Sequence, residues 1–302
     1  MYSVYVIVVT YKGKKWYDRC FSSLLASNLP LHIVAIDNAS NDGSVEFITK
    51  NYPEIKLIEC KENLGFGRGN NLGLSYALTH ECDYVFLLNQ DAWIEPNTIE
   101  TLVSIHQHYQ EYGILSPMHL NVDKTGLVMK HFCRQPDNEK LITDLYFNRL
   151  TDIYETKYIH AAAWLLPRNT LEIVGGFDPI FTHYEEDDDY LNRVRFHKLK
   201  IGVCPSARII HDHKERVVNP FNSNNRYRHE QALLVQLTNL NSSESITQFV
   251  LYTLRKSIVS LLKGDFSNAG RFWKDLIFTL KSIKSIKNSR QRNSMKARTW
   301  IE

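Results

Sequence analysis

Asn89, Gln90 and Asp91 follow directly after the apolar run Tyr84–Leu88. An apolar run with polar residues on both sides is typical of a strand that is buried on both faces of a sheet. In open α/β sheets, ligands bind where parallel strands reach their carboxyl ends. Mg²⁺ and Mn²⁺ prefer oxygen ligands and often bridge a protein carboxylate to substrate phosphates. Asp91 therefore predicts a divalent metal shared with a diphosphate; the alternative is a strand followed by a polar turn.

Two earlier strand-like runs also end in polar residues. Val4–Val9 is followed by Thr10 and Tyr11, and His32–Ile36 is followed by Asp37. In a parallel sheet these residues share one edge with the acidic residue described above. Asp37 could accept a hydrogen bond from a base imide or from a ribose hydroxyl. The alternative for its loop is a capped turn between a strand and a helix.

A glycine-rich segment, NLGFGRGNNLG, covers Asn63–Gly73 after a predicted strand at Lys56–Cys60. Its glycines would let the backbone approach a ligand closely, and the helix after it would supply free NH groups. The segment matches neither the dinucleotide fingerprint G-x-G-x-x-G nor the phosphate loop G-x-x-x-x-G-K-[ST]. Nicotinamide chemistry and ATP hydrolysis are therefore disfavoured.

Five consecutive carboxylates, Glu185–Asp189, precede a helix that we expect to begin near Tyr190. Neighbouring carboxylates raise one another's pKa unless cations or helix NH groups compensate. From the residues alone, the run fits either a functional site or an acidic first helical turn that opposes Arg193 and Arg195.

A histidine at the carboxyl end of a later strand could complete a metal site, because imidazole tolerates manganese. We predict His211 as this ligand or as a diphosphate contact, with His213 as the second candidate. A purely structural histidine is the alternative. Lys214 and Arg216 could neutralise diphosphate charge, and Asn219–Arg228 is expected to be a loop that orders over a bound ligand.

The composition favours one large domain with an appendage. The chain has 302 residues, 43% of them hydrophobic, a mean hydropathy of -0.32 and a net charge of +3. No stretch approaches the roughly 20 apolar residues of a membrane span, and the N-terminus lacks the pattern of a signal peptide. Five cysteines without paired spacing indicate neither a disulfide framework nor a zinc site. A reducing cytoplasm is the expected compartment.

The segments VVTYK, DNASNDGS, NLGFGRGNNLG and FLLNQDAWIEP occur in this order along the chain. Together they resemble the nucleotide-sugar-binding half of family 2 glycosyltransferases, especially the rhamnosyltransferase-like members that extend polysaccharides and lipid-linked glycans. The resemblance covers Val4–His211. It implies an α/β GT-A fold, with a Rossmann-like, mostly parallel sheet flanked by helices. It also implies an inverting transfer of a sugar, with rhamnose from a thymidine donor as the family-based expectation, to a glycan hydroxyl.

The resemblance assigns roles to residues at the predicted sheet edge. In place of the family's D-x-D-type element stands Asn89-Gln90-Asp91, whose first position is not a carboxylate and whose second is not the usual proline. Asp91 and His211 are then the metal ligands, and the cofactor is Mn²⁺ or Mg²⁺. The residues implied to contact the nucleotide sugar are Thr10, Tyr11, Asp37, Gly65, Phe66, Asn89, Gln90 and Asp91.

The family pattern Y-G-E-D-x-D matches Tyr184–Asp189. This match implies Asp187 as the catalytic base, which would take the proton of the acceptor hydroxyl. Glu185 replaces the usual glycine of the pattern. Glu186 is therefore the alternative base.

Between these motifs, Ile159–Leu166 is predicted to be a strand. Its Trp164 could stack on a sugar, whereas a core position is the more common one for such a tryptophan. Ile114–Met118 is predicted as a short strand in which Pro117 favours an edge position. We interpret Asn121–Thr156 as a variable excursion near the acceptor.

Two amphipathic helices are predicted near the C-terminus, at about Ile246–Leu261 and Ala269–Ile283. Lysines and arginines far outnumber acidic residues there. A basic face opposite Phe and Trp favours contact with the anionic inner membrane surface. The alternatives are a helical hairpin packed on the catalytic domain and a homodimer interface. The tail after about Asn288 is expected to be disordered, and nucleic-acid binding is disfavoured.

The expected organisation is therefore a GT-A catalytic domain at 1–240 and a basic helical appendage at 241–302. The catalytic domain divides into a nucleotide-sugar-binding half, 1–118, and an acceptor half with the base, 119–240. Two other functions stay open: a non-catalytic sugar-nucleotide-binding protein and a sugar nucleotidyltransferase.

Overall fold

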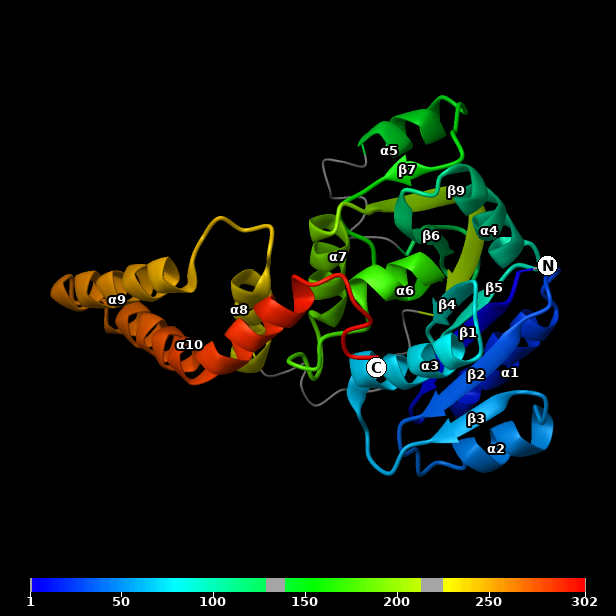
Figure 1. Cartoon of the computed structure of the whole chain (residues 1–302), viewed down its shortest axis with the longest axis horizontal. Helices are drawn as coiled ribbons and strands as arrows, with labels where there is room; N and C mark the ends of the chain where they lie inside the picture. The colour runs from blue at the N-terminus through cyan, green and yellow to red at the C-terminus, as the bar shows by residue number, and fades with distance from the viewer. Residues whose placement is uncertain (1, 129–138, 213–224, 302) are drawn as a thin grey trace.

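The computed structural model describes residues 2–128, 139–212 and 225–301. Within these ranges a nine-stranded sheet has helices packed on both of its faces (Figure 1). The strands are β1 (Val4–Thr10), β2 (His32–Asp37), β3 (Lys56–Glu59), β4 (Tyr84–Leu88), β5 (Ala92–Ile94), β6 (Tyr112–Leu120), β7 (Tyr154–Glu155), β8 (Ala163–Pro167) and β9 (Lys200–His211). The helices are α1 (Lys14–Leu25), α2 (Ser44–Asn51), α3 (Gly65–Thr79), α4 (Thr98–His108), α5 (Glu139–Tyr146), α6 (Arg168–Val174), α7 (Glu186–Phe196), α8 (Asn225–Thr238), α9 (Ile246–Leu262) and α10 (Phe266–Asn293).

The strand order is β3-β2-β1-β4-β8-β6-β9-β5, with β7 beside β9. The first four strands of this order run parallel, as do β6 and β9, whereas β8 is antiparallel to both β4 and β6. The predicted α/β fold, with a mostly parallel sheet between helices, is confirmed. Because β5 pairs with β9, the two predicted halves of the catalytic domain share one sheet.

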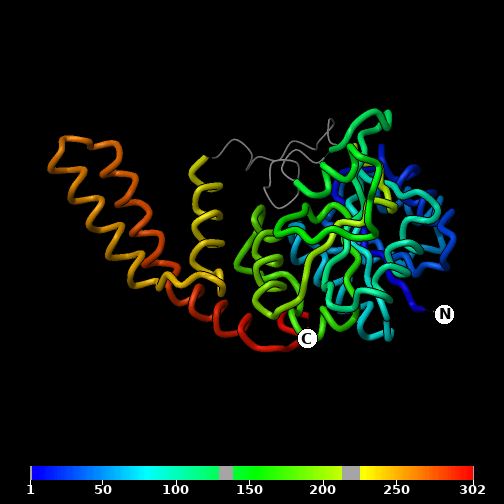
Figure 2. The backbone as a smooth tube through the Cα atoms, turned by 90° about the horizontal axis from the view of Figure 1, so that it is seen from above, coloured from blue at the N-terminus to red at the C-terminus, as the bar shows by residue number. Residues whose placement is uncertain are grey.

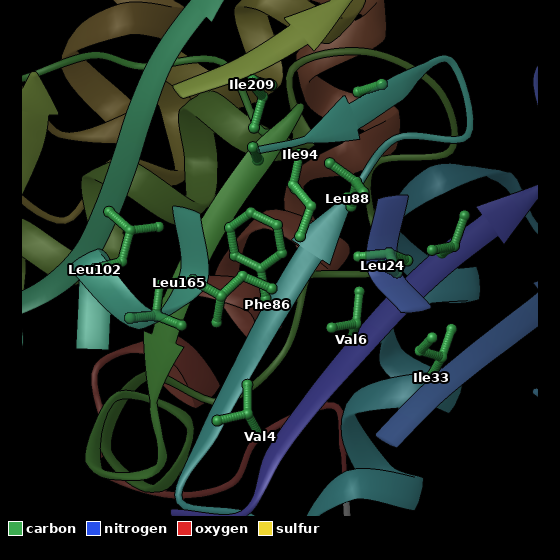
Figure 3. Packing of buried hydrophobic residues seen from close by; sticks show 14 of the residues in the cluster. Val4, Val6, Leu24, Ile33, Phe86, Leu88, Ile94, Leu102, Leu165 and Ile209 are labelled. Atoms are coloured by element: carbon green, nitrogen blue, oxygen red, sulfur yellow. The ribbon is translucent and has the colours of Figure 1, made fainter. Parts of the chain in front are cut away.

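The sheet separates two hydrophobic cores. Val4, Val6 and Val8 of β1 point to the core beneath α1, α2 and α4, and Ile7 points to the core beneath α3, α6 and α7. This alternation follows from the period of two along a strand. Figure 3 shows the first core, where Phe86 and Leu165 from neighbouring strands pack together. Burial on both faces explains why the strands are almost continuously apolar.

The glycine-rich segment differs from the prediction, because α3 already begins at Gly65. Its glycines therefore lie inside the helix rather than in a loop before it. A Cβ at Gly73 would collide with the Ile7 side chain of β1, and one at Gly69 would crowd Val9. These glycines allow α3 to pack closely on the sheet. From a sequence pattern alone, glycines needed for such packing cannot be told from glycines that let a ligand approach the backbone.

The strand β6 is also not at an edge, because it lies between β8 and β9. Pro117 is accommodated at a shift of register between Pro117 and Met118 in the pairing with β9. An irregularity of this kind tolerates a residue without a backbone donor. The predicted edge position is therefore wrong.

The C-terminal region forms a helical hairpin and then returns to the catalytic domain. Helices α9 and α10 project away from the sheet in both views (Figures 1 and 2). The predicted disorder after about Asn288 is wrong, since α10 continues to Asn293 and both Thr299 and Ile301 are buried. The backbone NH of Gly176 donates to the Thr299 carbonyl at 2.8 Å. The end of the chain thus packs on the turn that leads to α7.

Candidate active site

The carboxyl ends of β1 and β2 lie side by side, because Thr10 pairs with Asp37 in the parallel register. The Thr10 hydroxyl donates to Asp37 Oδ1 at 3.2 Å, and the Ser40 NH donates to Asp37 Oδ2 at 2.8 Å. Asp37 is buried. Its carboxylate is therefore oriented by Thr10 of β1 and by its own loop, and its predicted contact with a nucleoside stays a prediction.

Gln90 is held by the backbone of Tyr11. The Tyr11 NH donates to Gln90 Oε1 at 2.9 Å, and Gln90 Nε2 donates to the Tyr11 carbonyl at 3.1 Å. A Cβ at Gly13 would collide with this amide. Because both polar atoms of the side chain are engaged, Gln90 positions the end of β1 beside the end of β4. Gln90 thus has a positioning role, and its contact with the nucleotide sugar stays a prediction.

The neighbouring Asp91 faces His211. The pairing of β5 with β9 sets Ala92 opposite His211, and Asp91 Oδ1 lies 3.4 Å from His211 Nε2. The next residue, Asp212, accepts a hydrogen bond from the Trp16 indole at 3.1 Å. Asp91 and His211, which are 120 positions apart in the chain, thus meet at the edge where metal binding is predicted.

His119 of β6 is part of this site and was missed by the sequence reasoning. Its ring lies edge-on to that of His211, with 6.1 Å between the centroids, and its Nε2 is 3.3 Å from the Ser116 hydroxyl. His119 is almost fully buried. An apolar strand with one histidine carries no signal that would have identified it before the strand order was known.

The donor atoms of Asp91 and His211 fit a divalent metal that is shared with a diphosphate. One carboxylate and one imidazole suit Mn²⁺ or Mg²⁺, which take several of their ligands from phosphates and water. Residues 2–128, 139–212 and 225–301 contain no cluster of three or more metal-ligating side chains. A bound metal would take ligands beyond Asp91 and His211.

Gly65 and Phe66 at the start of α3 connect this edge to the acidic segment. Asn38 Nδ2 donates to the Gly65 carbonyl at 3.0 Å. Gly65 has φ +80°, and a Cβ there would collide with the Thr182 carbonyl. Phe66 packs edge-on against Phe177, with 5.6 Å between the ring centroids. The predicted base-binding residues thus lie against the segment that leads to the acidic helix.

The acidic residues form the first turn of α7, which begins at Glu186 rather than near Tyr190. Glu185 has φ 69°, a left-handed conformation that favours glycine, which is the residue that the family pattern places there. Asp189 forms a buried ion pair with Arg193 at 2.8 Å. The alternative of an acidic first helical turn that opposes Arg193 thus holds for Asp189, whose carboxylate anchors the helix. Carboxylates in the first turn are also favoured by the helix dipole.

The two candidate bases differ in burial. Glu186 is 7% exposed, and its Oε2 has no hydrogen-bond partner among the described residues. Burial and the nearby Asp187 raise the pKa of Glu186 to about 8. The side chain of Asp187 is 21% exposed. A buried Glu186 with a raised pKa is a poorer proton acceptor near neutral pH than the more exposed Asp187, which favours Asp187 as the base.

Tyr158 and His160 lie beside Asp187, and sequence reasoning missed both. His160 Nδ1 is 3.8 Å from Asp187 Oδ2 and 3.1 Å from the Tyr158 hydroxyl. Burial and the nearby Asp187 raise the pKa of Tyr158, so its hydroxyl stays protonated near neutral pH. The only sequence signal is the run YIH before β8, which resembles any strand entry.

The raised pKa of Glu186 gives a testable dependence of stability on pH. An unfolded glutamate has a pKa near 4.5, so between about pH 4.5 and 8 the unfolded chain has lost a proton that the folded chain keeps. The free energy of unfolding therefore falls as the pH rises through this window. We expect Glu186→Gln to be more stable than the wild type at pH 8, by on the order of a few kcal/mol, with the gain shrinking toward pH 5.

Urea unfolding of both proteins at pH 5 and pH 8 measures this difference. Glu62→Gln, which replaces an exposed carboxylate, is the matched control and should follow the wild type at both pH values. Equal effects of Glu186→Gln at the two pH values would contradict a protonated Glu186.

Trp164 does not reach the site. Its side chain is 0% exposed and stacks on Phe177, with 6.3 Å between the ring centroids and 13° between the planes. It also packs against Tyr190 of α7. The core alternative is therefore the correct one, and stacking of Trp164 on a sugar is excluded.

Part of the predicted ligand-binding segment lies outside the described residues. This holds for His213, Lys214 and Arg216, and for 219–224 of the predicted loop. The rest of that loop, from Asn225 onward, is instead the first turn of α8. The Tyr227 hydroxyl lies 2.7 Å from the Thr182 hydroxyl, so α8 contacts the segment before the acidic helix.

Comparison with known proteins identifies the family. The family model described as Glycosyl transferase family 2 matches residues 5–172. An N-acetylglucosaminyl-diphospho-decaprenol L-rhamnosyltransferase of Mycobacterium tuberculosis is 26% identical over 229 residues, which cover 68% of this chain and 75% of that protein. The low-salt glycan biosynthesis hexosyltransferase Agl10 of Haloferax volcanii is 24% identical over 214 residues, covering 68% and 66% of the two chains.

Among solved structures, S. aureus TarS in complex with UDP-GlcNAc aligns with a TM-score of 0.59 at 15% identity. The alignment covers 99% of this chain and 90% of that one. At this identity the likeness shows the fold, which agrees with the GT-A fold implied by the sequence motifs. The family model matches more than half of the chain, and the matched range includes Thr10, Asp37 and Asp91 at the sheet edge. This protein therefore belongs to glycosyl transferase family 2.

Proposed function

We propose that this glycosyltransferase moves a sugar, with inversion, from a nucleoside-diphosphate donor to a hydroxyl of a growing polysaccharide or lipid-linked glycan. The observation that carries the proposal is the convergence of Thr10, Asp37, Asp91 and His211 at one edge of the sheet, together with the partly exposed Asp187 in the first turn of α7. Rhamnose is the proposed sugar, because two relatives are named rhamnosyltransferases.

In this proposal Asp187 accepts the proton of the acceptor hydroxyl as that oxygen attacks the anomeric carbon. The carboxylate is exposed enough to contact an acceptor, and Tyr158 and His160 lie on one side of it. A single displacement inverts the anomeric configuration, and no second nucleophile is required.

Asp37 and Thr10 would bind the nucleoside, and Asp91 with His211 would hold the divalent metal. When bound, the metal supplies a positive charge that stabilises the departing diphosphate. Gln90 keeps the strand end that carries Asp91 in register with the Tyr11 backbone. The support for metal dependence is the donor set of Asp91 and His211, which suits Mn²⁺ or Mg²⁺.

The experiment that tests the function is slow donor hydrolysis by the purified protein across a panel of nucleotide sugars, with and without Mn²⁺. Hydrolysis of one donor, together with a rise in melting temperature caused by that donor alone, would identify the substrate. Release of pyrophosphate from a nucleoside triphosphate and a sugar phosphate would instead favour a nucleotidyltransferase. Donor binding without turnover in the presence of any acceptor would favour the non-catalytic alternative.

We also propose a peripheral location at the cytoplasmic face of the membrane. The support is the basic C-terminal hairpin and the diphospho-decaprenol acceptor that the name of the mycobacterial relative prints. None of the helices within the described ranges combines the length and the apolar character needed to cross a bilayer. A homodimer through the hairpin is the competing arrangement.

A further inference from the structure

The hairpin of α9 and α10 has apolar surface left over after the two helices have packed together. This packing buries part of the apolar stripe predicted for α9. Phe249 and Thr253 are buried, and the Ser257 hydroxyl donates to the Ala269 carbonyl at 3.2 Å. Other apolar side chains, including Ile258 and Leu261 of the same predicted stripe, remain exposed. These exposed residues are Leu251, Tyr252, Ile258, Val259, Leu261, Leu262, Phe266, Trp273, Ile277 and Leu280.

The exposure is greatest at the turn between the helices. Leu262 is 83% exposed and Phe266 is 73% exposed. Figures 1 and 2 both show this turn at the end of the hairpin that lies farthest from the sheet. Large exposed apolar side chains at a projecting tip indicate an interaction site rather than a surface that contacts only water.

The charge around this apolar surface is almost entirely positive. Asp265 caps α10 at the turn, and Asp275 of α10 is buried against Arg226 and His229 of α8. No other acidic side chain occurs in α9, α10 or their turn. The exposed basic side chains are Arg255, Lys256, Lys263, Arg271, Lys274, Lys281, Lys284 and Lys287.

We infer that the tip of this hairpin, Leu261–Phe266, inserts into an anionic lipid bilayer while the flanking lysines and arginines bind the headgroups. This assignment rests on the membrane location proposed above and names the surface that carries it. Apolar side chains rimmed by cations suit the boundary between headgroups and acyl chains. A second copy of the chain fits less well, because a symmetric contact would set two basic surfaces against each other.

Sedimentation with vesicles tests this assignment on the full-length protein. The vesicles contain phosphatidylglycerol and phosphatidylethanolamine, or phosphatidylcholine alone. We expect the wild type to bind the anionic vesicles, and the pair Leu262→Ser with Phe266→Ser to bind them at least about tenfold more weakly. Lys263→Gln with Lys274→Gln should also weaken binding and should flatten its dependence on salt.

The matched control is Tyr146→Ser with Phe147→Ser, which removes two exposed aromatic side chains at the end of α5. This control should bind vesicles like the wild type. Donor hydrolysis and melting temperature, measured without lipid, show that each variant is folded and keep the transferase proposal separate from the membrane proposal. The lysine pair provides a second test if the tip variant does not fold.

Three outcomes would overturn the assignment. If the wild type hydrolyses donor but ignores anionic vesicles, the membrane location fails. If the wild type binds and the tip and lysine variants bind equally well, the membrane location stands and the hairpin is not its contact. If the tip variant converts a dimer to a monomer in lipid-free sedimentation analysis, a second copy covers this surface.

Discussion

Asp187→Asn is expected to reduce the rate of sugar transfer by roughly 10²- to 10⁴-fold while leaving donor binding intact. The amide has nearly the shape of the carboxylate but cannot accept the proton of the acceptor hydroxyl. Asp187 is partly exposed at the start of α7, so the change should leave folding unaffected. Transfer to an acceptor, measured beside the donor-induced rise in melting temperature, separates the chemical step from binding.

Two neighbouring variants sharpen this test. Burial and the Asp187 charge raise the pKa of Asp188, so Asp188→Asn removes little charge near neutral pH and is the matched control. Glu186→Gln tests the alternative base. If Glu186→Gln abolishes transfer and Asp187→Asn costs less than about tenfold, the roles of the two residues must be exchanged.

Asp91→Asn is expected to abolish the effect of Mn²⁺ on donor binding and to lower the transfer rate more than the roughly 100-fold typical of residues that only orient metal ligands. Asp91 is the carboxylate that faces His211 at 3.4 Å, and an amide oxygen is a weaker ligand for a hard cation. The measurement is the donor-induced rise in melting temperature, titrated with Mn²⁺, together with the transfer rate.

Asp212→Asn is the matched control for this variant. It lies next to His211 but accepts from the Trp16 indole, and its amide oxygen can keep that hydrogen bond. Its response to Mn²⁺ should equal that of the wild type. A response to Mn²⁺ that survives in Asp91→Asn would show that this carboxylate is not a metal ligand.

The sheet edge could be predicted from the sequence because it depends on local patterns and one topological rule. Apolar runs identify β1, β2 and β4, and parallel strands place their carboxyl ends together. Thr10, Asp37 and Asp91 therefore occupy the places expected of them. His211 could also be placed there, since it ends a strand of the same sheet.

Contacts between distant segments were beyond the reach of the same reasoning. The amide of Gln90 pairs with the backbone of Tyr11, and His160 approaches Asp187 from a loop before β8. Neither contact follows from the spacing of residues, because each depends on which strands become neighbours. Trp164 shows the opposite case. A tryptophan can stack on a sugar, but α7 packs against Trp164 and buries it in the core.

Local propensity also misled where tertiary structure overrides it. Pro117 disfavours an internal strand, yet a register shift accommodates it between β8 and β9. The polar, basic C-terminus resembles a disordered tail, but Ser289 and Asn293 donate to the buried Asp178 at 2.6 and 2.7 Å. Those two hydrogen bonds satisfy Oδ2 of a buried carboxylate whose Oδ1 accepts from the Ile180 NH at 2.9 Å.

The return of the chain to the catalytic domain changes how the hairpin relates to the rest of the protein. The chain leaves this domain after α8 and comes back with Thr299 against Gly176. The hairpin is thus an insertion within one folded unit, so shortening the chain from its C-terminus would also remove Ile301 from the core that packs around α7.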